Sequence, residues 1–228
     1  MNGFGSAMVT LHNARVRLLA GAGVAFLLSA CGGSSPPELL AASSDIAVGA
    51  PVPGPTPFIS VVPLTGQSLK QVSIYRFQIT PKAGAVSRPV DVRYTAAAMA
   101  RRGFHADGSS TASLPVFGLY GGYTNQVKLE MIFTDGSRQE NVVNIVTPAY
   151  VDPNAKLDRP TLLQRRTSAG PTLNYLFLKS ALAGPLVMDS DAEVRWIAPG
   201  SVNAYTATFY DNAFYIGAQK ALGLSRIE

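Results

Sequence analysis

Hydrophobic and polar residues alternate most regularly over residues 126–133. One side of an extended chain there would carry Val127, Leu129, Met131 and Phe133, and the other Gln126, Lys128 and Glu130. A period of two indicates a strand with one buried face. Asp135-Gly136 suits a tight turn, and a second run of strand-forming residues follows over 140–146. The pattern predicts a hairpin of two antiparallel strands.

Shorter runs of the same kind occupy the chain from Phe58 onward. Strands are predicted over 72–79 and 90–94. The apolar set changes parity between Ile74 and Tyr75, which indicates a β-bulge. Only residues 96–102 favour a helix, and that segment is too short to form a layer. These patterns predict an all-β fold.

The spacing of the predicted strands changes after the connection that starts at Asp152-Pro153-Asn154. Two turns are expected, at 189–192 and 210–213. Strand candidates then recur over residues 173–178, 186–188, 194–197, 206–210, 214–216 and 224–227. This spacing is typical of the antiparallel sheet in a propeller blade.

The N-terminus has the three-part layout of a secretory signal. Arg15 and Arg17 precede an uncharged apolar run, Leu18 to Leu28, of 11 residues. As a helix this run would be about 16 Å long, which is too short for a hydrocarbon core of roughly 30 Å. Residues 1–30 are therefore predicted to be a cleaved signal peptide, and Met8 is a plausible alternative start.

The cleavage region resembles the lipobox of bacterial lipoproteins. Leu28-Ser29-Ala30-Cys31 ends in the only cysteine of the chain. The resemblance implies lipidation of Cys31 and anchoring on the periplasmic side of a bacterial membrane, expected to be the outer membrane. An ordinary signal peptide with an unmodified cysteine is the alternative. Residues 31–57, rich in glycine, serine and proline, are predicted to be a tether.

Charge and composition exclude several other roles. The formal net charge is +5, and the pairs Arg101-Arg102 and Arg165-Arg166 lack the interleaved aromatic residues that stack bases. Nucleic acid is therefore not an expected partner. With Cys31 used for lipid, no thiol remains for a disulfide, and stability must come from packing.

Residues 114–127 read L-P-V-F-G-L-Y-G-G-Y-T-N-Q-V, and residues 186–196 read L-V-M-D-S-D-A-E-V-R-W. The first stretch resembles a pattern of the bacterial arylsulfotransferase family, P-V-x-G-L-Y-A-D-Y-T-N-x-V, and the second resembles the first propeller hairpin of that family, D-x-x-G-x-V-R-W. Gly121-Gly122 replaces the usual Ala-Asp, and Ala192 replaces a turn glycine, which we expect to demand a turn without positive φ. The matching residues are Pro115, Gly118, Leu119, Tyr120, Tyr123, Asn125, Asp189, Arg195 and Trp196.

The resemblance implies a β-sandwich over residues 58–150, followed by a linker and the start of a six-bladed propeller over 151–228. It also implies sulfuryl transfer from an aryl sulfate to a phenol, without a nucleotide donor, through a sulfohistidine. No cofactor is expected. The chain has two histidines, His12 in the leader and His105, which is predicted to lie in a surface loop. No catalytic residue is therefore assigned within this chain.

Several residues admit a second interpretation. Asp189 and Asp191 could suggest calcium, but a turn between strands is favoured, and no metal site is assigned. Gly118, Gly121 and Gly122 could suggest a phosphate loop, but close strand packing is favoured. Arg195 and Trp196 are interpreted as packing residues in preference to a ligand cage.

Two hypotheses of function remain at this point. The chain is the N-terminal portion of an arylsulfotransferase-like lipoprotein, shortened within the first blade and inactive alone. Alternatively, it is a non-enzymatic lipoprotein that uses the sandwich and an exposed β edge for interaction, with a homodimer as one possibility.

Overall fold

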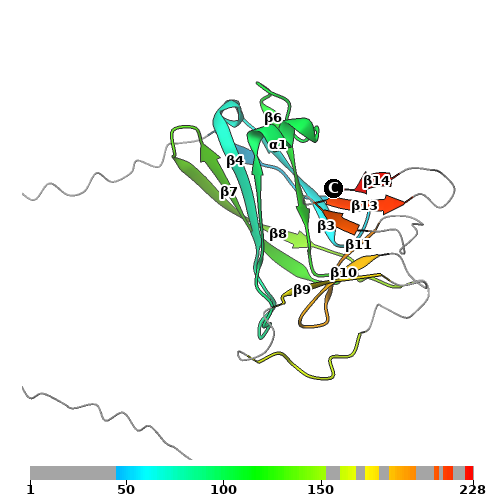
Figure 1. The fold of residues 1–228 in the computed structure, drawn as a ribbon. Helices are drawn as coiled ribbons and strands as arrows, with labels where there is room; N and C mark the ends of the chain where they lie inside the picture. The colour runs from blue at the N-terminus through cyan, green and yellow to red at the C-terminus, as the bar shows by residue number, and fades with distance from the viewer. Residues whose placement is uncertain are drawn as a thin grey trace, which may run out of the picture. The chain divides into compact units, whose positions relative to one another are not determined.

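The fold is organised around two antiparallel sheets of four strands each (Figure 1). The computed structural model describes residues 45–152, 160–167, 173–179, 185–198, 208–210, 213–217 and 224–227. In the first sheet, β3 (Ile59–Thr65) pairs along its whole length with β6 (Thr111–Phe117). Its other side pairs with β1 (Ala47–Val48) and β2 (Val52–Pro53).

The second sheet has the order β5–β4–β7–β8. Its strands are β4 (Val72–Ile79), β5 (Val90–Thr95), β7 (Thr124–Phe133) and β8 (Arg138–Val146). A 3-10 turn, η1 (Gln67–Gln71), leads into β4, and the helix α1 (Ala96–Arg101) follows β5. In the described part of the chain, no helix is long and apolar enough to cross a membrane.

The two sheets enclose one apolar core. Every second residue of their strands points into it, and the aromatic rings of Phe77 and Phe117 meet across the sheets at a centroid distance of 5.5 Å. Fully burying an apolar side chain of this size contributes about 1.5–3 kcal/mol. The most buried strand residues are Val62, Leu64, Leu114, Val116, Tyr75, Phe77, Ile79, Val127, Leu129 and Met131. This arrangement confirms the all-β sandwich.

The predicted hairpin and bulge are both present. β7 and β8 pair from Thr124↔Val146 to Ile132↔Arg138, and the amide of Gly136 donates to the carbonyl of Phe133 in the turn. The register of β4 against β7 shifts between Val72 and Ile74, just before the parity change at Ile74 and Tyr75 that predicted a bulge. The short helix also forms where it was predicted, capped by the side chain of Thr95.

The predicted tether is too long at its C-terminal end. Residues 52–53 form β2 and residues 47–48 form β1, so the sheet begins well before Phe58. Asp45 ties this entry to η1, because its carboxylate accepts hydrogen bonds from the amides of Gln67 and Ser68 at 2.7 and 2.8 Å. Hydrogen bonds from Ser68 and Gln67 lower the pKa of Asp45. Residues 31–44 lie outside the described residues.

The sequence pattern did not predict two strands of the first sheet, β3 in its interior and β6 at its edge. Each carries a proline, Pro63 or Pro115, and proline within an apolar run argues against a central strand. The structure accommodates both prolines within the β3–β6 pair, opposite Ser113 and Val61 respectively. The carbonyl oxygen of Pro63 still accepts a hydrogen bond from the amide of Gly49 at 2.8 Å.

His105 is buried, which corrects the prediction of a surface loop residue. Its residue exposure is 6 %. Nδ1 lies 2.8 Å from the hydroxyl of Tyr75, and Nε2 lies 3.1 Å from the carbonyl oxygen of Ser109. Because the carbonyl can only accept, Nε2 carries the proton and the Tyr75 hydroxyl donates to Nδ1. Burial raises the pKa of that hydroxyl, which keeps it a donor.

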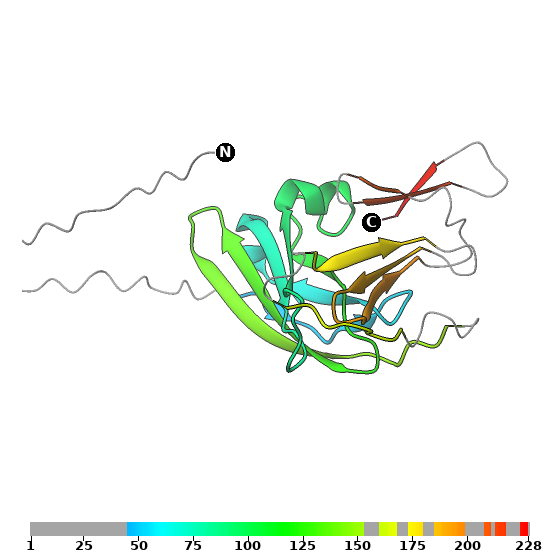
Figure 2. The same cartoon turned by 60° about the horizontal axis from the view of Figure 1, so that its bottom comes forward.

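Two further antiparallel sheets of three strands follow the sandwich (Figure 2). The first contains β9 (Tyr175–Leu178), β10 (Leu186–Asp189) and β11 (Val194–Ile197). The second contains β12 (Thr208–Tyr210), β13 (Ala213–Gly217) and β14 (Leu224–Ile227). These strands match the predicted series, and their place in a propeller stays a prediction. Residues 211–212, in the second predicted turn, lie outside the described residues.

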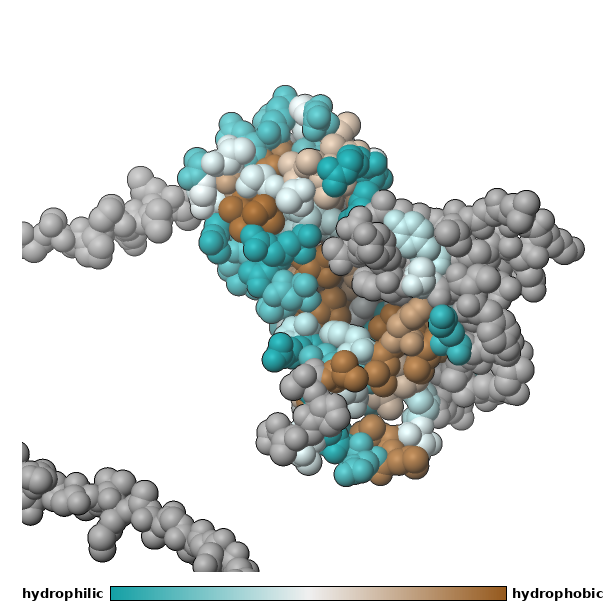
Figure 3. Space-filling view, in the orientation of Figure 1, coloured by the Kyte–Doolittle hydropathy of each residue, from teal (hydrophilic) through white to brown (hydrophobic). Residues whose placement is uncertain are grey.

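The surface differs in character between these parts. Figure 3 shows hydrophilic residues over much of the upper left of the visible face and hydrophobic residues gathered lower down. Apolar side chains are exposed after the sandwich, including Leu163 at 94 % and Leu176 at 42 %. All described residues nevertheless fall within one compact unit, Leu40–Glu228.

Candidate functional site

The first family-like motif forms the end of β6, a tight loop over residues 118–123 and the start of β7. Pro115 lies in β6, and Leu119 is buried in the sandwich core. Asn125, which is fully buried, shapes the loop. Its Oδ1 accepts the amide of Tyr120 at 2.8 Å, and its Nδ2 donates to the carbonyls of Tyr120 and Tyr123 at 3.0 and 3.3 Å. The Asn125 side chain thus supplies the hydrogen-bond partners that the loop backbone would otherwise find in a neighbouring strand.

The glycines of this loop allow close approach and left-handed turns. Gly118 has φ 81°, and a Cβ there would lie 3.1 Å from a methyl of Val90. Gly122 has φ 61°, and its amide donates to the carbonyl of Pro148. A Cβ at Gly121 would lie 3.4 Å from the Phe58 ring. Close packing therefore accounts for the three glycines.

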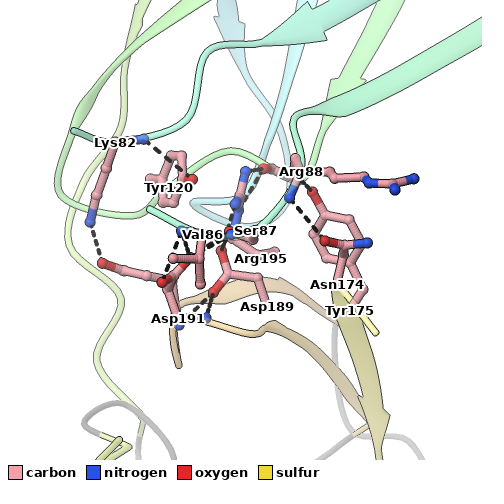
Figure 4. A network of polar contacts seen from close by, with 12 residues as sticks. Lys82, Val86, Ser87, Arg88, Tyr120, Asn174, Tyr175, Asp189, Asp191 and Arg195 are labelled. Carbon is pink, nitrogen blue, oxygen red and sulfur yellow. Dashed lines mark hydrogen bonds and ion pairs between the residues drawn. The ribbon is translucent and has the colours of Figure 1, made fainter. Parts of the chain in front are cut away.

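Arg195 joins the second motif to the first (Figure 4). It lies in β11, with 2 % of its side chain exposed. Nε and Nη2 donate to the carbonyl oxygen of Gly118 at 2.9 and 2.6 Å, and Nη1 donates to Asp189 Oδ2 at 2.7 Å. The guanidinium carbon also lies 3.6 Å from the ring centroid of Tyr120, a cation–π contact. A buried cation is thereby paired and hydrogen-bonded.

Asp189 is the anion of this pair and also the organiser of the β10–β11 turn. Its side chain is fully buried. Oδ1 accepts the amides of Asp191 and Glu193, both at 3.0 Å. Ala192 in the turn has φ 65°, so the expectation of a turn without positive φ there is wrong. An Ala in this conformation is strained, and the hydrogen bonds to Asp189 hold the turn in place.

Asp191 reaches from this turn to the β4–β5 loop, residues 80–89. Its Oδ2 accepts the amides of Val86 and Ser87, both at 2.9 Å, and the Ser87 hydroxyl at 2.7 Å. Partial burial raises the pKa of Asp191, but the hydrogen bonds from Ser87 and Val86 outweigh burial and hold that pKa below its ordinary value of 3.8. The carboxylate therefore stays charged where the loop amides converge.

Other contacts fasten the same loop to the sheet that follows the sandwich. Lys82 Nζ lies 2.6 Å from Glu193 Oε1 and above the rings of Tyr120 and Tyr123. The hydroxyl of Tyr175 donates to the carbonyl of Arg88 at 2.7 Å. Burial raises the pKa of Tyr175 to about 12, so this donor is retained at neutral pH. We call the set Lys82, Ser87, Gly118, Tyr120, Asp189, Asp191, Glu193 and Arg195 the clamp.

Apolar packing continues on both faces of the β9–β11 sheet. Phe58, from the sandwich, packs with Leu186, Met188 and Val194. Trp196 packs on the other face in a cluster that includes Ile59. Trp196 thus has a packing role, and the neighbouring residues Phe58 and Ile59 reach opposite faces of one sheet.

The chemistry of the clamp is that of a structural junction. The carboxylates of Asp189 and Asp191 are turned towards amide, hydroxyl and guanidinium donors, which leaves no arrangement typical of a calcium site. Across the described residues, no group of three or more His, Cys, Asp and Glu side chains could hold a metal ion. Cys31 lies outside those residues.

The motifs identified most of the clamp, but not Lys82 or Ser87, and they also missed the packing residue Phe58. Ser87 and Lys82 lie in a loop with no periodicity, more than 100 residues before their partners. The only sequence signal for them is polarity in a loop, which does not distinguish a contact from solvated surface.

Replacement of Arg195 by methionine should strongly destabilise the chain. The change leaves the Asp189 carboxylate buried without its ion pair and the Gly118 carbonyl without two donors. Removing one partner of such a pair costs about 3–5 kcal/mol. Urea denaturation, followed through Trp196 fluorescence, measures this free energy of unfolding.

Two variants control this experiment. Arg93→Met, at an exposed position of β5, should change the free energy of unfolding by less than about 0.5 kcal/mol. The double variant Arg195→Met with Asp189→Asn should recover part of the loss, because no uncompensated charge remains and the amide oxygen at 189 can still accept the two turn amides. An Arg195→Met loss no larger than that of Arg93→Met would contradict the role assigned to the clamp.

Comparison with known protein families agrees with this geometry. Residues 56–148 match the family described as the arylsulfotransferase Ig-like domain. This range contains the loop 118–123, Asn125 and the β4–β5 loop, the sandwich side of the clamp. A comparison with curated proteins gave no match. The sandwich of this chain, over residues 56–148, is thus similar to the Ig-like domain of arylsulfotransferases.

Proposed function

We propose that the chain is the N-terminal portion of an exported arylsulfotransferase-like lipoprotein, in which the Ig-like domain holds the following β-sheets in a fixed orientation. We call the Ig-like domain in this role the seat. The observation that carries this proposal is the insertion of Arg195, from the second motif, onto the Gly118 carbonyl of the first. The β9–β11 sheet is then the beginning of the family's propeller.

The arrangement of the seat supports a positioning role. The loops that contact Asp191 and Arg195 lie at the end of the sandwich where β5 begins, whereas α1 lies where β5 ends. A buried cation with two directional bonds to one carbonyl fixes orientation more tightly than apolar contact alone does. The seat would thus set the angle at which the following sheets leave the sandwich.

A lipid anchor near the N-terminus agrees with this proposal. Cys31 is the only cysteine and ends a lipobox-like sequence, and the first described residue, Asp45, follows it closely along the chain. Lipid at Cys31 would hold the chain at a membrane surface. The compartment would be the periplasmic side of a bacterial membrane.

We assign no part in the reaction chemistry to the residues that the structure describes. The family reaction moves a sulfuryl group from a phenolic ester to another phenol through a histidine. Both ring nitrogens of His105 are engaged, by Tyr75 and Ser109, so His105 is proposed to be structural. The seat would act by positioning.

Lipidation is the first test of this proposal. When the full chain is produced in a bacterial host, mass spectrometry should find a mature N-terminus at Cys31 that carries acyl chains. Cys31→Ala should remove the acyl mass and release the protein from the membrane fraction. Ser29→Thr, next to the processing site, is a control that leaves the thiol in place. An unmodified Cys31 in the wild-type protein would contradict the anchor.

Turnover of an aryl sulfate is the second test. With 4-nitrophenyl sulfate as donor and phenol as acceptor, the purified chain should release 4-nitrophenol no faster than buffer does. The physical reason is that no histidine of the sandwich is free to become the nucleophile. Turnover that His105→Ala abolishes would overturn the structural role of that residue.

A further inference from the structure

The outer strand β8 presents unpaired backbone groups along its length. β8 is the last strand of its sheet. The amide of Thr147 donates to Tyr123 and that of Phe133 to Ser137, so odd-numbered residues of β8 bond to β7. Even-numbered residues of β8 therefore direct their N–H and C=O groups away from β7. Among the described strands, none pairs with that side.

The other edges of the sandwich carry features that block pairing, and the second half of β8, residues 142–146, does not. β2 has two residues and ends at Pro53, and β6 contains Pro115. β5 is shorter than β8 and carries Asp91 and Arg93. Prolines, charges and short length are the usual protection of an edge strand. β8 has nine residues and no proline, and its residues 142–146 have no charge.

Two valines make this part of the edge apolar. Val142 and Val146 are 62 % and 76 % exposed. They lie four residues apart and point to the same face, as do all even-numbered residues of the strand. Asn144 lies between them, and it is exposed as well.

We propose that β8 is a self-association edge, at which two copies of this chain join their second sheets into one continuous sheet. The strands run antiparallel about a two-fold axis at Asn144. Val142 then faces Val146 of the partner subunit, and Val146 faces Val142 of the partner subunit. Asn144 faces Asn144 of the partner subunit. Because even-numbered residues carry the free groups, these three pairs are the hydrogen-bonded ones and each exchanges two bonds.

The pattern of β8 selects both the occupant and the register. A spacing of four between the valines is complementary to itself in an antiparallel pair, so a second copy covers every exposed valine. An axis at Glu140 would oppose two like charges, and one at Val142 would place Arg138 against Val146 of the partner subunit. Opposed valines stabilise a pair, and opposed carboxylates destabilise it. The axis at Asn144 is therefore the most favourable register, because it opposes valines and no like charges.

Disulfide cross-linking in membranes from cells that produce the full chain tests this pairing. The proposed register places the two Cα atoms of residue 144 about 5.5 Å apart, within disulfide range. Asn144→Cys should therefore give a covalent dimer on mild oxidation, and Val142→Cys should give much less. The wild type, with Cys31 alone, and Arg93→Cys, on the opposite edge, are the controls.

Introducing a charge on the β8 edge distinguishes specific strand pairing from random collision of two chains. Adding Val142→Lys to Asn144→Cys should lower the cross-linked fraction about tenfold, because it removes both valine contacts and buries an amine. The same change should leave the far-UV circular dichroism spectrum unaltered, since Val142 is exposed. Equal cross-linking of Val142→Cys, Arg93→Cys and Asn144→Cys, or none at Asn144→Cys, would overturn the proposal.

Discussion

The buried contact of Arg195 with Asp189 and the Gly118 carbonyl is the constraint on which the described structure depends. A guanidinium out of water is costly unless every side of it is compensated. Here the compensation comes from both parts of the chain. Asp189 belongs to the same hairpin as Arg195, whereas Gly118 and Tyr120 belong to the sandwich. The arginine is therefore satisfied only when the two parts are together, which makes their association specific and not merely apolar.

The rest of the junction follows from that requirement. Gly118 must lack a side chain, because a Cβ there would press on Val90. Asn125 must hold the loop so that the Gly118 carbonyl points outward, and Asp189 must form the turn that brings Asp191 to Ser87. Each polar group meets a partner that another part of the fold supplies. This mutual dependence is why residues as distant in sequence as Lys82 and Glu193 lie together.

Sequence patterns predicted the elements whose signal is local. The β7–β8 hairpin, the bulge in β4 and the turn at Asp189 follow from alternation and turn residues. They missed β3 and β6, because Pro63 and Pro115 locally oppose a strand and only the paired neighbour makes one. They placed His105 at the surface because its partner, Tyr75, is remote in sequence. They excluded a positive φ at Ala192, where hydrogen bonds to Asp189 override the intrinsic preference of alanine.

Because the clamp joins them, the sandwich and the β9–β11 sheet should unfold as one cooperative unit. The single tryptophan, Trp196, reports on β11, whereas far-UV circular dichroism reports mainly on the larger sandwich. Equilibrium urea denaturation of the full chain, followed by both signals, is the most direct test. If the clamp joins the two parts, the fluorescence and circular dichroism transitions should coincide in midpoint and slope. A fluorescence transition complete at a lower urea concentration, before the circular dichroism signal changes, would contradict it.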